Sequence, residues 1–105
     1  QLRFQLMKRN RRPNPTFQPV DLQQLRQRID GLDTRLLRLL SQRAVLALRV
    51  GRLKKQRGLK LFDPQRERAI LHRMTRANGG PLSPAAVRAI YREILTQVRR
   101  LERSV

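Results

Sequence analysis

The sequence predicts an all-α fold with three helices per chain, one long and two shorter, assembled into an intertwined helical homodimer. From about residue 21 to residue 57, apolar residues recur at alternating steps of three and four, which is the spacing of a heptad seam. Two later segments each begin with a capping residue followed by proline, a typical helix start. No segment shows the apolar/polar alternation that indicates a strand.

The long helix is expected to run from Asp21, as its N-cap, to about Arg57, with Gly58 as the stop signal. Its seam is formed by nine apolar residues, namely Leu22, Leu25, Ile29, Leu32, Leu36, Leu39, Leu46, Val50 and Leu53. A second row widens the apolar face so that other helices can pack there; it comprises Leu37, Leu40, Ala44, Ala47, Leu48 and Gly51.

This helix is too long for one chain of 105 residues to cover. A helix of ~36 residues is ~54 Å long, whereas a compact domain of ~100 residues has a radius of gyration of only ~13 Å. The seam therefore requires a partner chain, and we expect an obligate homodimer.

Two shorter helices follow. Asp63, followed by proline, opens the second helix, and the Asn-Gly-Gly-Pro run at 78–81 ends it. Ser83, again followed by proline, opens the third helix, which extends to about Arg103. One face of this third helix is apolar, with Val87, Ile90, Tyr91, Ile94, Leu95, Val98 and Leu101.

Residues 1–20 form a basic segment with three prolines, five basic residues, no acid and no periodicity. This composition predicts a disordered N-terminal arm, which leaves residues 21–105 as the folded domain. The first residue is Gln rather than Met. The sequence leaves open whether Met7 is the natural start or the chain is a fragment.

The composition argues against several kinds of function. Without Cys there is no disulfide or thiolate chemistry, and one His with seven acids argues against a metal site made of protein ligands alone. No apolar run approaches the ~20 residues of a membrane span, so no membrane association is expected. No signal-peptide pattern opens the chain, and we expect a cytoplasmic location.

The net charge of +18 makes nucleic-acid binding an alternative to consider. The four aromatic residues form no stacking platform for bases, however, and the basic residues are spread around the helices rather than gathered on one face. The charge pattern therefore argues against a nucleic-acid partner. It leaves two interpretations open, solvated basic faces or a field that attracts a small anionic substrate.

Arg43 stands on the seam where an apolar residue is expected. Because a guanidinium always carries its charge, Arg43 either meets a carboxylate inside the assembly or binds an anionic ligand. Lys54 follows 11 residues later, ~16 Å along the axis, so both side chains could reach one small ligand. Arg26 lies ~25 Å from Arg43 along the helix and would approach it only from the partner in an antiparallel pair.

Taken together, these residues resemble the all-helical class of chorismate mutases. The resemblance covers about residues 21–103 and rests on a combined pattern rather than on a single motif. The pattern comprises Leu25-Arg26, Ile29, Leu32-Asp33, Leu36-Leu37, Leu39-Leu40, Arg43, Gly51, Lys54, the run DPQRER at 63–68, the run IYREIL at 90–95, and Leu101-Glu102.

The resemblance implies the rearrangement of chorismate to prephenate in aromatic amino-acid biosynthesis, with no cofactor, metal or covalent intermediate. It also implies an intertwined dimer with shared active sites. Arg43, Lys54 and Glu102 would be catalytic. Arg43 and the partner's Arg26 would clamp substrate carboxylates. Lys54 would reach the ether oxygen and a carboxylate, and Glu102 would face that oxygen from the opposite side.

The other substrate contacts implied by the resemblance lie on the two shorter helices. Glu67 would accept a hydrogen bond from the ring hydroxyl, helped by the backbone at Asp63, and Arg66 would be a supporting cation. Val98 stands where many members carry a small or hydroxyl residue, so one polar contact would be missing. Glu102 stands where many members carry Gln, so it must be protonated to donate a hydrogen bond.

Three other functions stay open. The isochorismate-pyruvate lyases share the fold and the basic site, although Glu67 favours the mutase because those lyases lack this hydroxyl acceptor. Mutase domains of this class also occur attached to prephenate dehydratase or to the enzyme that opens the shikimate pathway, so a fused or regulatory partner enzyme is a second alternative. A basic helical nucleic-acid-binding module is the third.

Overall fold

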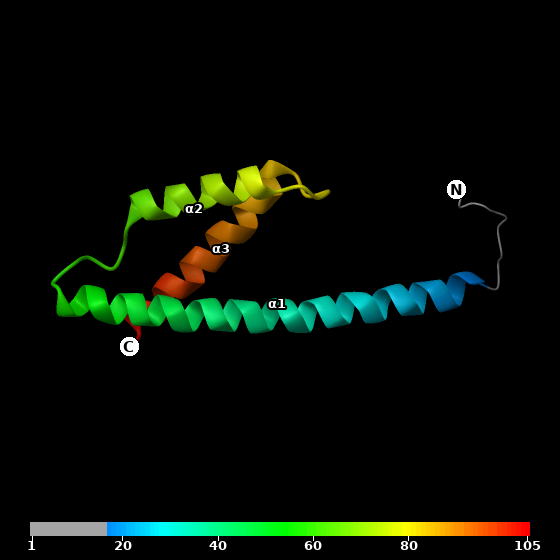
Figure 1. The fold of residues 1–105 in the computed structure, drawn as a ribbon, viewed down its shortest axis with the longest axis horizontal. Coiled ribbons are helices and arrows are strands. Elements are labelled where there is room, and N and C mark those ends of the chain that lie inside the picture. The colour runs from blue at the N-terminus through cyan, green and yellow to red at the C-terminus, as the bar shows by residue number, and fades with distance from the viewer. Residues whose placement is uncertain (1–16) are drawn as a thin grey trace. The chain divides into compact units, whose positions relative to one another are not determined.

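The computed structural model describes residues 17–105, and its side chains from residue 21 onward. It contains three helices, α1 (Phe17–Gln56), α2 (Pro64–Ala77) and α3 (Pro84–Arg103), and no strand within that range (Figure 1). This confirms the predicted all-α class with one long and two shorter helices. The predicted disordered arm lies mostly outside the described residues.

The start of α1 differs from the prediction. The helix begins at Phe17, so Asp21 lies inside it and the expected N-cap at Asp21 is wrong. Pro19 made this segment look non-helical, but the first four N–H groups of a helix have no intrahelical acceptor. A proline in the first turn therefore removes no hydrogen bond, and the helix begins ahead of it.

The end of α1 follows the prediction at Gly58, whose φ of 68° is accessible to glycine at little cost. The Leu59 N–H donates to the Lys54 carbonyl at 2.8 Å, and the Gly58 N–H donates to the Lys55 carbonyl at 3.2 Å. These are the two hydrogen bonds of a Schellman motif. They end the helix and direct the chain toward α2.

The starts of α2 and α3 are the predicted caps. The Asp63 carboxylate accepts from the Arg66 backbone N–H at 3.0 Å, and the Ser83 hydroxyl oxygen accepts from the Ala86 N–H at 3.1 Å. Between the two helices, the Asn78 side chain donates to the Leu82 carbonyl at 2.6 Å and accepts from the Gly80 N–H at 3.2 Å. Local side-chain chemistry therefore closes this turn.

Residues 40–105 form one compact unit, and the part of α1 up to Leu39 belongs to another. In the first of these, the C-terminal end of α3 lies beside the C-terminal part of α1 (Figure 1). Its buried apolar side chains are Ile70 of α2 with Val87 and Leu95 of α3. The second apolar row of α1 also belongs to this unit. Its members there are all buried or half-buried, namely Leu40, Ala44, Ala47, Leu48 and Gly51.

The seam of α1 is not covered within the chain. Its residues up to Leu39 are 50% to 61% exposed, and Leu46, Val50 and Leu53 are exposed as well. A heptad row of this length in contact with water is typical of a helix that packs against a second helix. In residues 17–105, none of the helices combines the length and apolar composition needed to cross a membrane.

Candidate active site

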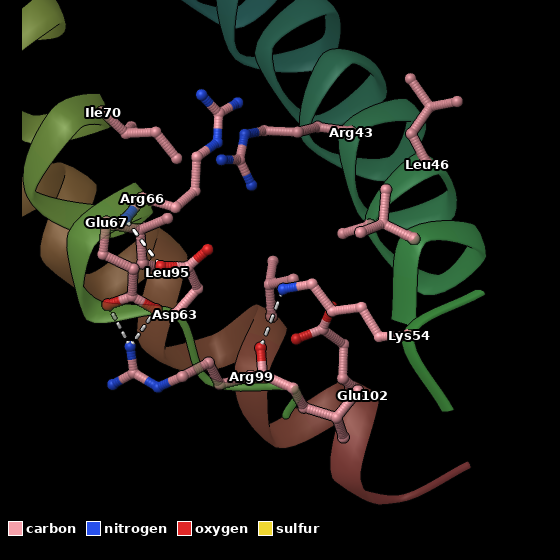
Figure 2. Close-up of a pocket in the computed structure, with 14 residues that line it drawn as sticks. Arg43, Leu46, Lys54, Asp63, Arg66, Glu67, Ile70, Leu95, Arg99 and Glu102 are labelled. Atoms are coloured by element: carbon pink, nitrogen blue, oxygen red, sulfur yellow. Dashed lines mark hydrogen bonds and ion pairs between the residues drawn. The ribbon is translucent and has the colours of Figure 1, made fainter. Parts of the chain in front are cut away.

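A cavity of about 260 Å³ lies within the unit formed by residues 40–105. All three helices and the connector between α1 and α2 contribute to its wall (Figure 2). Its lining combines apolar and charged side chains, namely Arg43, Leu46, Ala47, Val50, Lys54, Leu61, Asp63, Arg66, Glu67, Ile70, Leu95, Val98, Arg99 and Glu102. Seven of the eight residues predicted from the sequence for the site are therefore in one place.

Arg43 extends from α1 into this cavity and is half-buried (Figure 2). Among residues 21–105 the salt bridge present joins Arg99 and Glu67, so no carboxylate of the described chain pairs with Arg43. The structure therefore shows no pairing of Arg43 with a carboxylate among residues 21–105 of the same chain. Its position suits a charge that is available to an anion.

Lys54 lies in the last turn of α1 and is half-buried. Its Nζ donates a hydrogen bond to the Leu61 carbonyl at 3.2 Å, which directs the ammonium into the cavity (Figure 2). An ammonium has three donors, so two remain for a ligand. The connector therefore holds the cation at a defined place without neutralising its charge.

The first turn of α2 supplies three charged side chains. Asp63 caps the helix through the Arg66 backbone N–H, which leaves the Arg66 guanidinium to extend toward the cavity (Figure 2). Glu67 follows directly and is half-buried in the wall. Helix propensity and capping thus place a carboxylate and a guanidinium one residue apart at a helix N-terminus, where backbone N–H groups also face outward.

Glu67 is paired with Arg99 of α3, a residue that the sequence did not predict for the site. The guanidinium of Arg99 also lies over the Phe62 ring, 4.9 Å from its centroid. Sequence reasoning missed Arg99 because it stands beside Arg100 on an arginine-rich helix and its partner is 32 residues away. The signal available was its spacing of three residues before Glu102, which puts both on one helix face.

Glu102 approaches α1 at Gly51, which is buried. A Cβ added at Gly51 would lie 3.4 Å from Glu102 Oε2, an ordinary van der Waals distance. The end of α3 thus places the Glu102 carboxyl group close to the long helix at Gly51. Val98, one turn earlier on α3, is half-buried and presents an apolar surface to the cavity.

Arg26 is the predicted site residue that does not line this cavity. It is exposed and lies on the part of α1 that belongs to the other unit. Its predicted contribution comes from the partner chain, and it stays a prediction.

The charges at the cavity are unequal in number and in pairing. Four cations line it, Arg43, Lys54, Arg66 and Arg99, against three carboxylates, Asp63, Glu67 and Glu102. One ion pair and one helix cap engage two of the carboxylates. No Ser, Thr, Cys, His or Tyr is part of the lining, and residues 21–105 contain no cluster of three or more metal-ligating side chains. This arrangement suits binding of a small anion and stabilisation of charge rather than nucleophilic attack.

The known proteins that this chain resembles include several that carry chorismate mutase in their names. Residues 25–103 match the family described as Chorismate mutase type II. The chain is 39% identical over 89 residues to the bifunctional chorismate mutase/prephenate dehydratase of Aquifex aeolicus, covering 81% of this chain and 25% of that protein. It is 38% identical over 53 residues to the chorismate mutase of Methanocaldococcus jannaschii, covering 50% and 54% of the two chains.

A solved structure has the same fold. Form II of the chorismate mutase from Thermus thermophilus superposes with a TM-score of 0.78 at 36% sequence identity, covering 79% of this chain and 94% of that one. The chain spans about a quarter of the length of the bifunctional relatives it matches. The family match covers most of the chain, including every predicted site residue, and the chain belongs to the type II chorismate mutase family.

Proposed function

We propose that this domain rearranges chorismate to prephenate. The observation that carries the proposal is the cavity in which Arg43, Lys54 and Arg66 have no ion-pair partner among residues 21–105, in a chain of the chorismate mutase family. The reaction breaks one C–O bond and forms one C–C bond within a single molecule. No proton, electron or leaving group is exchanged, so the reaction requires neither a nucleophile nor a general base.

Catalysis in this proposal comes from holding the substrate and from placed charge. Chorismate is a dianion, and two guanidinium groups can bind its carboxylates with bidentate geometry. Arg43 and the partner's Arg26 take this role and select the folded conformer in which the reacting carbons are close. Lys54 donates to the ether oxygen, where negative charge develops as the C–O bond breaks.

The remaining polar groups orient the ring and assist the breaking bond. Glu67 accepts a hydrogen bond from the ring hydroxyl near the Asp63 backbone, and Arg66 adds positive charge beside the carboxylates. Glu102, in its protonated form, donates to the ether oxygen from the side opposite Lys54. Val98 contacts the substrate through its apolar surface.

We further propose that a second copy of the chain completes each site. The exposed seam of α1 supports this, because six leucine and isoleucine side chains up to Leu39 are at least half exposed. Antiparallel pairing of two such helices buries both seams and brings Arg26 of one chain toward the cavity of the other. A homodimer then contains two equivalent shared sites.

Partner enzymes and location stay predictions. The bifunctional relatives carry prephenate dehydratase in the same chain, which supports a fused or associated enzyme that consumes prephenate. The predicted cytoplasmic location and disordered arm are likewise not tested by the fold.

The decisive assay follows the absorbance of chorismate in the presence of the purified protein and identifies the product by chromatography. Conversion to prephenate without added metal or cofactor is expected. The same assay with isochorismate separates the lyase alternative, which would release pyruvate and salicylate. A folded protein that leaves chorismate unchanged refutes the proposal. Heparin affinity that survives moderate salt would instead support a nucleic-acid-binding function.

A further inference from the structure

The ion pair between Arg99 and Glu67 forms one wall of the cavity. A single nitrogen of Arg99, Nη1, donates to both carboxylate oxygens of Glu67 at 2.5 Å. The side chains are only 25% and 21% exposed, so the pair is largely withdrawn from water. It therefore differs from surface ion pairs, which compete with solvent and contribute little.

Arg99 is itself held by two further contacts. Its guanidinium carbon lies 4.9 Å from the centre of the Phe62 ring, a distance at which a cation and an aromatic face attract each other. Its Nη2 donates to the Thr96 hydroxyl oxygen at 3.4 Å. The connector before α2 and the preceding turn of α3 thus both contact the guanidinium. Arg99 in turn contacts both oxygens of the Glu67 carboxylate.

We propose that Arg99 is a positioning residue that aims Glu67 at the substrate hydroxyl and offsets its negative charge. An ionised carboxylate has about four acceptor positions, and a nitrogen placed between the two oxygens leaves the outer ones for a ligand hydroxyl. Without Arg99, an unpaired carboxylate in the cavity wall would repel a dianionic substrate. This inference rests on the proposed mutase function, since the hydroxyl and the two carboxylates belong to chorismate.

A double-mutant cycle on turnover tests this role. The variants are Arg99→Met, which keeps the apolar stem, Glu67→Gln, and the two combined. Arg99→Met should lower kcat/KM about tenfold, the loss expected for one charge-assisted hydrogen bond. The loss should fall mainly on KM, because the contact to the hydroxyl and the repulsion act on bound substrate and transition state alike. In the Glu67→Gln background, Arg99→Met should cost almost nothing further.

Two controls keep the result specific. Arg100→Met makes the same substitution at the next residue of α3, which is exposed, and should leave kcat and KM unchanged. Arg99→Lys retains the charge and should recover part of the loss in KM. The same cycle measured by thermal unfolding reports whether Arg99 and Glu67 are coupled in solution.

Three results would overturn the inference. Losses in kcat/KM that multiply in the double variant would show that Arg99 does not act through Glu67. Absence of coupling in thermal unfolding would show that the pair does not form. A fall in kcat at constant KM, together with a lower melting temperature, would show a structural role only. Failure of the wild-type protein to convert chorismate is a separate outcome, which removes the proposed function itself.

Discussion

Arg43 offers the sharpest test of how this cavity works, because it places a permanent charge on an otherwise apolar seam. In Arg43→Met the apolar stem is kept and the guanidinium is removed. Among residues 21–105 no carboxylate pairs with Arg43, so the substitution leaves no orphaned acid behind. It removes a charge that is half-buried and has no ion-pair partner among residues 21–105.

The two interpretations of Arg43 predict different magnitudes. Breaking a buried ion pair typically costs ~3–5 kcal/mol of folding free energy, and ~1 kcal/mol shifts the melting temperature of a domain of this size by ~4–8 °C. A structural pair would therefore lower the melting temperature by well over ~10 °C. A ligand-binding Arg43 leaves stability equal or slightly higher. The loss of a bidentate carboxylate contact, at ~1.5–3 kcal/mol per charged hydrogen bond, should then lower kcat/KM at least about a hundredfold.

The measurement combines steady-state turnover of chorismate with thermal unfolding of the same samples. Arg52→Met is the matched control, since Arg52 is exposed on the same helix and lies off the heptad seam. It should change neither quantity appreciably. If the melting temperature of Arg43→Met falls together with its activity, Arg43 is a structural residue and the reasoning fails.

Three further predictions follow from the site. Mixing the inactive variants Arg26→Ala and Lys54→Ala should restore about a quarter of wild-type activity after subunit exchange. About half of the dimers are then mixed, and one of the two sites in each draws its intact Arg26 and its intact Lys54 from different chains. No recovery, with exchange proven by mass spectrometry, would contradict shared sites. Glu102→Gln should retain or gain activity, because the amide nitrogen can donate a hydrogen bond to the ether oxygen; an inactive Gln variant would exclude Glu102 as a donor. Gly51→Ala should raise stability by up to ~1 kcal/mol through helix propensity, since the added Cβ lies at an ordinary 3.4 Å from Glu102 Oε2; a lower melting temperature would show that the contact is too tight.

The parts of the fold that were predicted correctly depend on local chemistry. Asp63 and Ser83 cap their helices through N–H groups three residues away, and Gly58 ends α1 through bonds to the preceding turn. Such signals are contained in a few consecutive residues, so the sequence displays them. The start of α1 was missed because Pro19 was interpreted as a helix breaker, although it lies in the first turn.

The site shows where sequence reasoning reaches its limit. Seven of the predicted residues line one cavity. They could be predicted because helical spacing and family resemblance can both be recognised at individual positions of the sequence. Arg99 was not predicted, since its importance depends on Glu67, which is 32 residues distant, and on Phe62 in the connector. No spacing rule relates three positions on separate elements. Only the packing of α3 against the start of α2 brings them together.

The connector that follows the end of α1 also helps to fix the position of the Lys54 ammonium. The carbonyl of Lys54 accepts from the Leu59 N–H, while its Nζ donates to the Leu61 carbonyl, so the connector grips this one residue at its backbone and at its tip. The connector thus holds Lys54 at both its backbone carbonyl and its ammonium. A change in loop length would leave both flanking helices intact and still misplace the charge. The position of the Lys54 ammonium therefore depends on the length of the connector and on the turn at Gly58, more than on the connector's exposed side chains.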